Sequence, residues 1–121
     1  MAIKHVRREL SQVVVVGVYI VDADNETRDL YTMPRAGRIQ EYTFFSSAAL
    51  GGANGIDVLN GGSSGTGTTV LQACTDNLNG DESVVGAADE VARLAVIRVR
   101  ADDYTAARDV GVQMTLELYG Y

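Results

Sequence analysis

Val110–Leu118 reads VGVQMTLEL, and apolar side chains alternate with polar or small ones along its whole length. Strict alternation sends successive side chains to opposite faces of a β-strand, so we expect a strand with one buried face. Leu94–Ala101, LAVIRVRA, also reads as a strand. The chain is therefore expected to end in two strands.

Gln12–Val21, QVVVVGVYIV, carries apolar side chains on both faces of a strand. Such a strand is covered on both sides within one protein or lies at a contact between subunits. We therefore expect a central strand or a contact strand here, and we expect the chain to associate with itself.

Turn signals divide the region between these segments. The polar run Asp22–Asp29 predicts a turn, Pro34 and Gly37 frame a corner, and Asn60–Gly65, NGGSSG, predicts a hairpin connection. Strands are expected at Leu30–Met33, Arg38–Ser47, Gly55–Asn60 and Thr66–Thr75.

Two details of this region are specific enough to test. Alternation along Arg38–Ser47 would place Ile39 on the same face as Phe45. Asp76–Glu90 is mostly acidic and contains two glycines, which favours a long loop, with room for a short helical turn at Ala87–Val91.

About seven or eight short strands joined by glycine-rich turns are typical of an all-β protein. We expect a single β-sandwich or jelly-roll-like domain of antiparallel strands. The length of 121 residues fits one domain.

Composition excludes several classes of protein. Hydrophobic residues make up 46% and charged residues 21%, close to the average soluble globular protein, which argues against disorder. The longest apolar stretch, Val13–Val21, falls far short of the roughly 20 residues of a spanning helix, so no membrane partner is expected. The net charge of −6 repels phosphate backbones, so nucleic-acid binding is not expected either.

The first ten residues differ from the rest. Lys4 and His5 are the only lysine and the only histidine, and Arg7 and Arg8 lie beside them, whereas the remaining body has seven arginines against fifteen carboxylates. We therefore divide the chain into an extended N-terminal arm, residues 1–10, and a β-sandwich domain, residues 11–121. The arm is either a solvated terminus or a segment that binds the acidic surface of a partner.

Few groups suited to catalysis are present. One cysteine, Cys74, excludes an intrachain disulfide, and a single histidine disfavours a zinc site or a His-based triad. We expect Cys74 to be a buried hydrophobe, and we expect no enzyme, no catalytic residue and no cofactor. The oxygen-rich runs Asp22–Glu26 and Asp76–Glu82 lack the glycine and closing glutamate of a calcium loop, so both are interpreted as solvated turns.

Arginine outnumbers lysine nine to one. Guanidinium groups bind carboxylates and stack on aromatic rings, so this ratio is compatible with extensive protein–protein contact, although genome composition would produce the same bias. The better candidates for such contact are Arg35, Arg38, Arg98 and Arg100, with Tyr31, Tyr42 or Tyr104 as stacking partners.

Five segments give the chain a distinctive layout: the arm Ile3–Arg8, the corner Pro34–Ile39, the small-residue run Ser46–Asn54, the turn Asn60–Gly62 and the strand Val110–Leu118. With this layout the chain resembles small virion proteins of tailed bacteriophages. Within that group its size is similar to that of the capsid decoration, or cement, proteins.

The resemblance implies a structural virion protein on the outer surface of an assembled phage capsid. It would bind there as a homotrimer and cement neighbouring major capsid subunits. The implied capsid-binding residues of the arm are Ile3, Lys4, Val6, Arg7, Arg8 and Leu10. The candidates for the trimer interface are Val14, Val16, Tyr19, Tyr119 and Tyr121.

A second hypothesis is a tail or head-fibre module that binds host-surface carbohydrate. Exposed tyrosines such as Tyr31, Tyr42 and Tyr104 would then stack on sugar rings.

Overall fold

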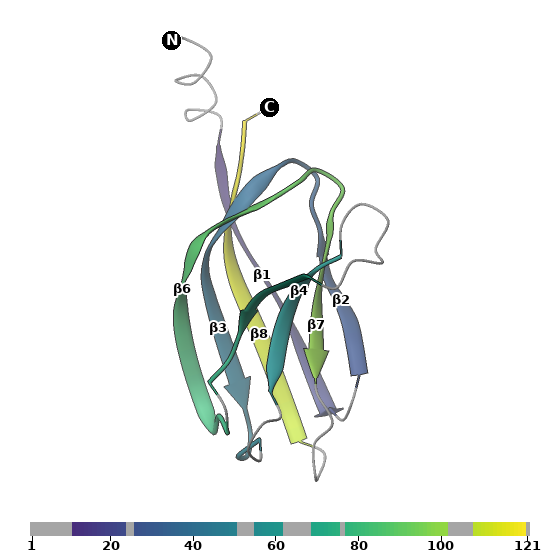
Figure 1. Cartoon of the computed structure of the whole chain (residues 1–121), viewed down its shortest axis with the longest axis vertical. Helices are drawn as coiled ribbons and strands as arrows, with labels where there is room; N and C mark the ends of the chain where they lie inside the picture. The colour runs from purple at the N-terminus through teal and green to yellow at the C-terminus, as the bar shows by residue number, and fades with distance from the viewer. Residues whose placement is uncertain are drawn as a thin grey trace.

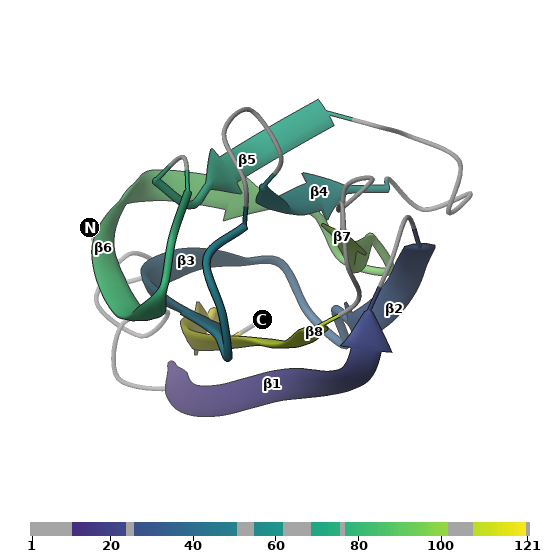
Figure 2. The ribbon, with the colours of Figure 1, turned by 90° about the horizontal axis from the view of Figure 1, so that it is seen from below.

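A computed structural model of the chain describes residues 11–23, 26–50, 55–61, 69–75, 77–101 and 108–120, with the side chains of 87–89 left out. These residues form two four-stranded antiparallel sheets (Figures 1 and 2). Sheet A contains β1 (Gln12–Ala23), β8 (Arg108–Leu118), β3 (Gly37–Ser46) and β6 (Gly80–Val91). Sheet B contains β2 (Glu26–Thr32), β7 (Val96–Ala101), β4 (Ile56–Asn60) and β5 (Thr69–Ala73). The expected all-β sandwich is confirmed.

The strand order makes the fold jelly-roll-like. Sheet A runs β1-β8-β3-β6 and sheet B runs β2-β7-β4-β5, so every connection except β4 to β5 passes from one sheet to the other. The first and last strands are paired, from Gln12 opposite Leu118 to Ile20 opposite Val110. Figure 2, which looks along the sandwich, shows the two layers.

The core lies between the sheets and follows the alternation in the sequence. The inward side chains of β8 are Val110, Val112, Met114, Leu116 and Leu118, each at most 3% exposed. Ile97 and Val99 of β7 face them with no exposure at all. Burying one such side chain stabilises the fold by about 1.5–3 kcal/mol. The burial confirms that both predicted terminal strands contribute to the core.

A β-bulge in β3 overturns the predicted face of Ile39. The register of β3 shifts between Ile39 and Glu41 against both neighbouring strands. Ile39 and Glu41, which flank Gln40, therefore point to opposite faces of the sheet instead of the same one. Ile39 is therefore fully buried like Tyr42, whereas Phe45 is only half-buried. At this bulge the backbone of β6 approaches so closely that a Cβ on Gly86 would collide with the Ile39 carbonyl oxygen.

Part of the predicted turn Asp22–Asp29 is wrong, because β2 begins at Glu26. The polar side chains of this strand face solvent and have charged partners. Arg28 Nε donates to Glu26 Oε2 at 2.8 Å, and Arg98 Nε of β7 donates to Asp29 Oδ1 at 2.7 Å. One ion pair within β2 and one across to β7 let this polar segment join the edge of the sheet, which the hydrophobic pattern does not reveal.

The predicted loop at Asp76–Glu90 is also wrong for most of its length. Residues 80–91 form β6, which pairs with β3 from Gly37 opposite Val91 to Ser46 opposite Gly80. This strand lies at the edge of sheet A, where acidic side chains such as Asp81 stay in solvent. The helical turn at Ala87–Val91 is replaced by the same strand.

Candidate functional site

The outward face of β1 carries a row of exposed apolar side chains. Val13 is 60%, Val15 57%, Tyr19 55% and Val21 61% exposed. The intervening residues point inward, and Ile20 is fully buried. β1 pairs with β8 along one side only, because it is the first strand of its sheet. The expected strand therefore lies at an edge rather than at the centre.

β1 is less protected than the other three edge strands. β6 carries Asp81, Glu82 and Glu90, β2 carries a run of charged side chains, and β5 is only five residues long. Charged side chains and short length are the usual protections against edge-to-edge association. No charged residue occurs from Val13 to Val21, so an unprotected apolar edge is left open to a partner.

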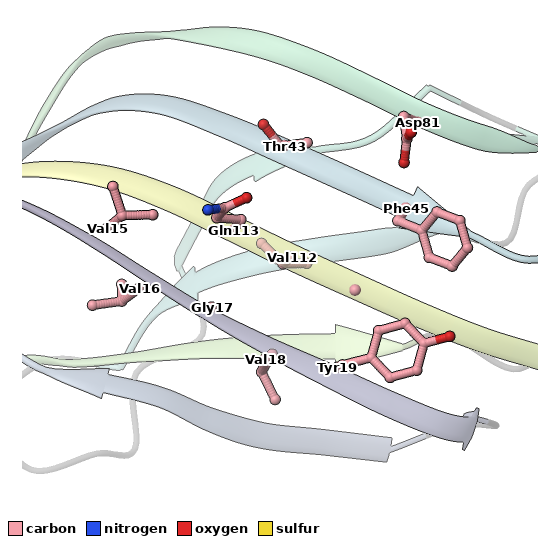
Figure 3. A pocket seen from close by; sticks show the side chains of 11 residues that line it. Val15, Val16, Gly17, Val18, Tyr19, Thr43, Phe45, Asp81, Val112 and Gln113 are labelled. Atoms are coloured by element: carbon pink, nitrogen blue, oxygen red, sulfur yellow. The ribbon is translucent and has the colours of Figure 1, made fainter.

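A shallow hollow of about 570 Å³ lies beside this row on the outer face of sheet A (Figure 3). The rings of Tyr19 and Phe45 stack across it, with centroids 6.1 Å apart and planes 23° apart. Gly111 of β8 lies between them in the sheet. It pairs with Tyr19 of β1 on one side and with Phe45 of β3 on the other. A Cβ on Gly111 would be 3.3 Å from Tyr19 Cδ2, so the glycine makes room for the aromatic pair.

Polar groups border the hollow. Thr43, Asp81 and Gln113 contribute to its lining. The Tyr19 hydroxyl donates to Asp109 Oδ2 at 3.2 Å, and Asp109 Oδ1 accepts the Asp22 backbone N–H at 3.1 Å. Partial desolvation raises the pKa of Tyr19 above its ordinary value of 10.0, and the hydrogen bond to Asp109 and the negative charge of that carboxylate raise it further. Tyr19 is thus a neutral donor at physiological pH.

The proposed trimer-interface residues fall in different environments. Tyr19 lies on the exposed face of β1, whereas Val14 and Val16 are half-buried and pack against the core of the same chain. Tyr119 is 9% exposed, and its hydroxyl donates to Glu90 Oε1 at 2.6 Å, so its ring lies against its own domain. Tyr121 lies outside the described residues.

All the implied capsid-binding residues, Ile3, Lys4, Val6, Arg7, Arg8 and Leu10, also lie outside the residues that the structure describes. The division into an arm, residues 1–10, and a domain, residues 11–121, therefore stays a prediction.

The arginines expected to contact partners have partners within the chain. The ion pairs are Arg38 Nε to Glu117 Oε1 at 2.8 Å, Arg98 Nε to Asp29 Oδ1 at 2.7 Å and Arg100 Nη2 to Asp57 Oδ2 at 2.7 Å. Arg35 Nη2 donates to Gln12 Oε1 at 3.1 Å. Arg38, Arg98 and Arg100 therefore have no support as partner-binding residues, because carboxylates of the same chain already neutralise them. Gln12 is a neutral amide, so its contact with Arg35 does not neutralise that guanidinium.

The tyrosines expected to bind sugars do not form a surface. Tyr42 is fully buried and stacks on Phe44 in the core, with centroids 6.2 Å apart, so its predicted exposure is wrong. Tyr31 is half-buried against the core, and Tyr104 lies outside the described residues. Tyr42 is buried because it pairs with Met114, whose side chain faces the core, and directly paired residues lie on the same face of a sheet.

Groups for chemistry are sparse in the described part of the chain. No cluster of three or more His, Cys, Asp or Glu side chains there is arranged to hold a metal ion. The same residues include no helix that has the length and hydropathy to cross a membrane. Cys74 is buried, as expected, and burial raises the pKa of its thiol, so the reactive thiolate is disfavoured.

No protein-family model and no curated protein sequence matches the chain. Two chains from phage capsid structures share its fold. One belongs to the acid-stable capsid of Helicobacter pylori bacteriophage KHP30, with a TM-score of 0.65 and 11% identity over 92% of this chain and 94% of that one. The other belongs to the capsid asymmetric unit of cyanophage Pam1, with a TM-score of 0.52 and 16% identity over 90% and 84%.

Sequence reasoning missed most of the exposed row and the hollow. It named Tyr19 but chose Val14 and Val16 instead of Val13 and Val15, because a strand with valines on both faces does not reveal which face meets the core. Nothing in the local sequence connects Tyr19 with Phe45 and Gly111, since these residues meet only through strand pairing. An outward-facing aromatic residue paired with a glycine on the next strand would have indicated such a hollow, but recognising it requires knowing how the strands pair.

Proposed function

We propose that this chain is a structural virion protein that binds the outside of an assembled phage capsid as a homotrimer and cements neighbouring major capsid subunits. The observation that carries the proposal is the unprotected apolar face of β1, because a surface of this kind on an edge strand requires a partner. The fold shared with chains of two phage capsid structures supports the choice of a capsid as the assembly.

Self-association would cover the β1 row. A cyclic trimer uses two different surfaces of each subunit, so the row formed by Val13, Val15, Tyr19 and Val21 would contact another part of the next copy. Tyr19 is the one residue of the exposed row that is also a candidate from the sequence. Val14, Val16, Tyr119 and Tyr121 remain candidates from the sequence alone.

The arm would provide attachment to the capsid. Lys4, Arg7 and Arg8 would pair with carboxylates of the major capsid protein, while Ile3, Val6 and Leu10 would fill apolar grooves. Three arms on one trimer convert weak individual contacts into tight attachment, since each further contact forms at a high effective concentration.

Light scattering and co-sedimentation test this function. The purified protein should have a mass near three chains and should pellet in a saturable manner with capsids of the phage that encodes it. Deleting residues 1–10 should leave a folded trimer that no longer pellets. A monomeric protein that stays in the supernatant would overturn the cementing function, and full capsid occupancy by the deletion variant would overturn the role of the arm.

The hollow favours one alternative, a tail or head-fibre module that binds host-surface carbohydrate. Tyr19 and Phe45 offer aromatic faces, and Thr43, Asp81 and Gln113 offer polar groups of the kind that bind sugar hydroxyls. A glycan array separates the two functions. A cement protein gives no signal, whereas a carbohydrate-binding module gives a signal that Tyr19→Ala abolishes.

A further inference from the structure

Two turns are tied together at one end of the sandwich. The β2–β3 connection contains Met33 to Ala36, and the β6–β7 connection contains Ala92 to Ala95. The Met33 N–H donates to the Ala95 carbonyl at 2.9 Å, and the Leu94 N–H donates to the Met33 carbonyl at 2.8 Å. These bonds fix the two turns as one unit, which lies at the upper end of the molecule in Figure 1.

The start of β1 and the end of β8 lie at the same end. Arg35 Nη2 donates to Gln12 Oε1 at 3.1 Å, and the Tyr119 N–H donates to the Ala36 carbonyl at 2.9 Å. Residue 11, which follows the basic block of residues 1–10 in the sequence, is therefore next to this pair of turns.

Leu94 is unusual in this turn for two reasons. Its φ is +68°, in the left-handed region that disfavours residues with a Cβ and favours glycine. Its side chain is also 51% exposed, so burial in the core does not compensate for the strain. The hydrogen bond from the Leu94 N–H to the Met33 carbonyl holds this backbone conformation, and it leaves the leucine side chain half exposed. The exposed side chain is therefore the feature that a contact outside the chain would use.

Charge distinguishes the two ends of the sandwich. The paired turns contain Arg35 and Arg93 and no carboxylate, and Pro34 and Arg93 are exposed. The described carboxylates near the strand ends at the opposite end are Asp22, Glu26, Asp57, Asp81, Glu82 and Asp109, with Arg108 beside them. Glu90 and Glu117 lie in the strands beside the paired turns, where Glu90 accepts from the Tyr119 hydroxyl and Glu117 pairs with Arg38. The cationic surface is therefore limited to the two turns themselves.

We propose that Pro34, Arg35, Arg93 and Leu94, here called the tip, dock onto a protein surface that offers an apolar pocket bordered by carboxylates. Leu94 enters the pocket, and the two arginines pair with the carboxylates around it. The inference rests on the proposed function, since the outer surface of the assembled capsid is the partner. The sandwich then stands with its tip and the beginning of β1 toward the capsid and its acidic end outward.

The chemistry of the tip favours a protein over a nucleic acid as the partner. A phosphate backbone is negative along its whole length, so it would repel the acidic remainder of this chain, which carries a net charge of −6 overall. An exposed leucine also gains most from an apolar pocket, which a row of phosphates does not provide.

The test compares four variants with the unaltered full-length protein in capsid co-sedimentation. Leu94→Gly should raise the unfolding temperature, because glycine adopts the left-handed conformation without strain, yet it should weaken capsid binding by about tenfold or more. Arg93→Glu should weaken binding to a similar degree. The matched control is Arg28→Glu, which makes the same change of charge at an exposed position of the edge strand β2 and should bind as the unaltered protein does.

The outcomes separate the tip from the proposed function. If the unaltered protein does not pellet with capsids, the cementing function and the tip both fail. If it pellets and Leu94→Gly and Arg93→Glu pellet equally well, the function stands and the tip is wrong. Leu94→Asn, which also tolerates a positive φ, repeats the test with a second side chain. Retention of the unaltered protein on double-stranded DNA, lost in Arg93→Glu, would overturn the protein partner in favour of a nucleic acid.

Discussion

Cys74 is a buried thiol whose protonation state is coupled to folding. It is 7% exposed, and its Sγ accepts a hydrogen bond from the Ile56 N–H at 3.3 Å, between β4 and the end of β5. Burial raises the pKa of the thiol above its ordinary value of 9.0, and the charges of Glu82 and Asp57 act in the same direction. The hydrogen bond from Ile56 opposes this shift but does not reverse it.

We therefore predict an alkaline loss of stability that depends on Cys74. A folded-state pKa above the unfolded value gives a contribution that is complete below about pH 9 and is lost as the pH rises through the folded value. Urea unfolding at pH 8 and pH 10.5 should show a larger drop for the unaltered protein than for Cys74→Ala. Equal drops would contradict the assignment. At pH 8 the native thiol should also react with a disulfide reagent far more slowly than the unfolded chain.

At the scale of an element, the bulge of β3 sets which side chains reach the core. Without the bulge at Gln40, simple alternation would turn Ile39 to the solvent side together with Phe45. β6 follows this distortion, because Asp89 pairs with Ile39 and Val85 pairs with Glu41, which leaves Gly86 beside the bulge. Position 86 therefore has no room for a Cβ, a requirement that the local sequence does not show.

Gly86→Ala should lower the free energy of unfolding by about 1–3 kcal/mol, the usual cost of forcing extra volume into a close contact. The cause is the Ile39 carbonyl oxygen, which the new Cβ would meet. Chemical denaturation measures the effect. The matched control is Val85→Ala at the neighbouring position, where the side chain is 79% exposed and the change should stay within about 0.5 kcal/mol. A Gly86→Ala protein as stable as its control would show that the bulge adapts.

At the scale of the whole molecule, the arrangement of edges explains why self-association is expected. The sandwich has four edge strands, and charge or short length protects three of them. The fourth, β1, exposes valines and Tyr19 beside an aromatic hollow. Only the folded chain presents this face, so self-association through it stabilises the native state by mass action.

The unfolding temperature should accordingly rise with protein concentration. Val15→Lys, which places a charge in the centre of the exposed row, should remove this dependence and reduce the mass in solution to that of one chain. Thr27→Lys, at an exposed position on the edge strand β2, is the control and should keep both properties. Calorimetry at two concentrations provides the measurement. A concentration-independent transition in the unaltered protein would argue against self-association through β1.

Much of the secondary structure follows from the sequence, because alternation is a local property. The strands at Val110–Leu118 and Arg38–Ser47 were predictable to within a residue or two, since both segments are rich in strand-forming residues and the turn signals before Arg38 mark its start. Only Val110–Leu118 also showed which of its side chains are buried. β6 and the first half of β2 were not, because their polar side chains are stabilised by neighbouring strands and by solvent rather than by a hydrophobic face.

The candidate binding surfaces depend on contacts between distant residues. Gln12–Val21 reads as a strand from its own composition, but its place at an edge depends on which strands pair with β8. The tip likewise exists only because backbone hydrogen bonds join residues 33 and 94. Local periodicity thus specifies that a segment is extended and apolar. Only the tertiary structure reveals which residues pack against that segment, because those residues are distant from it in the sequence.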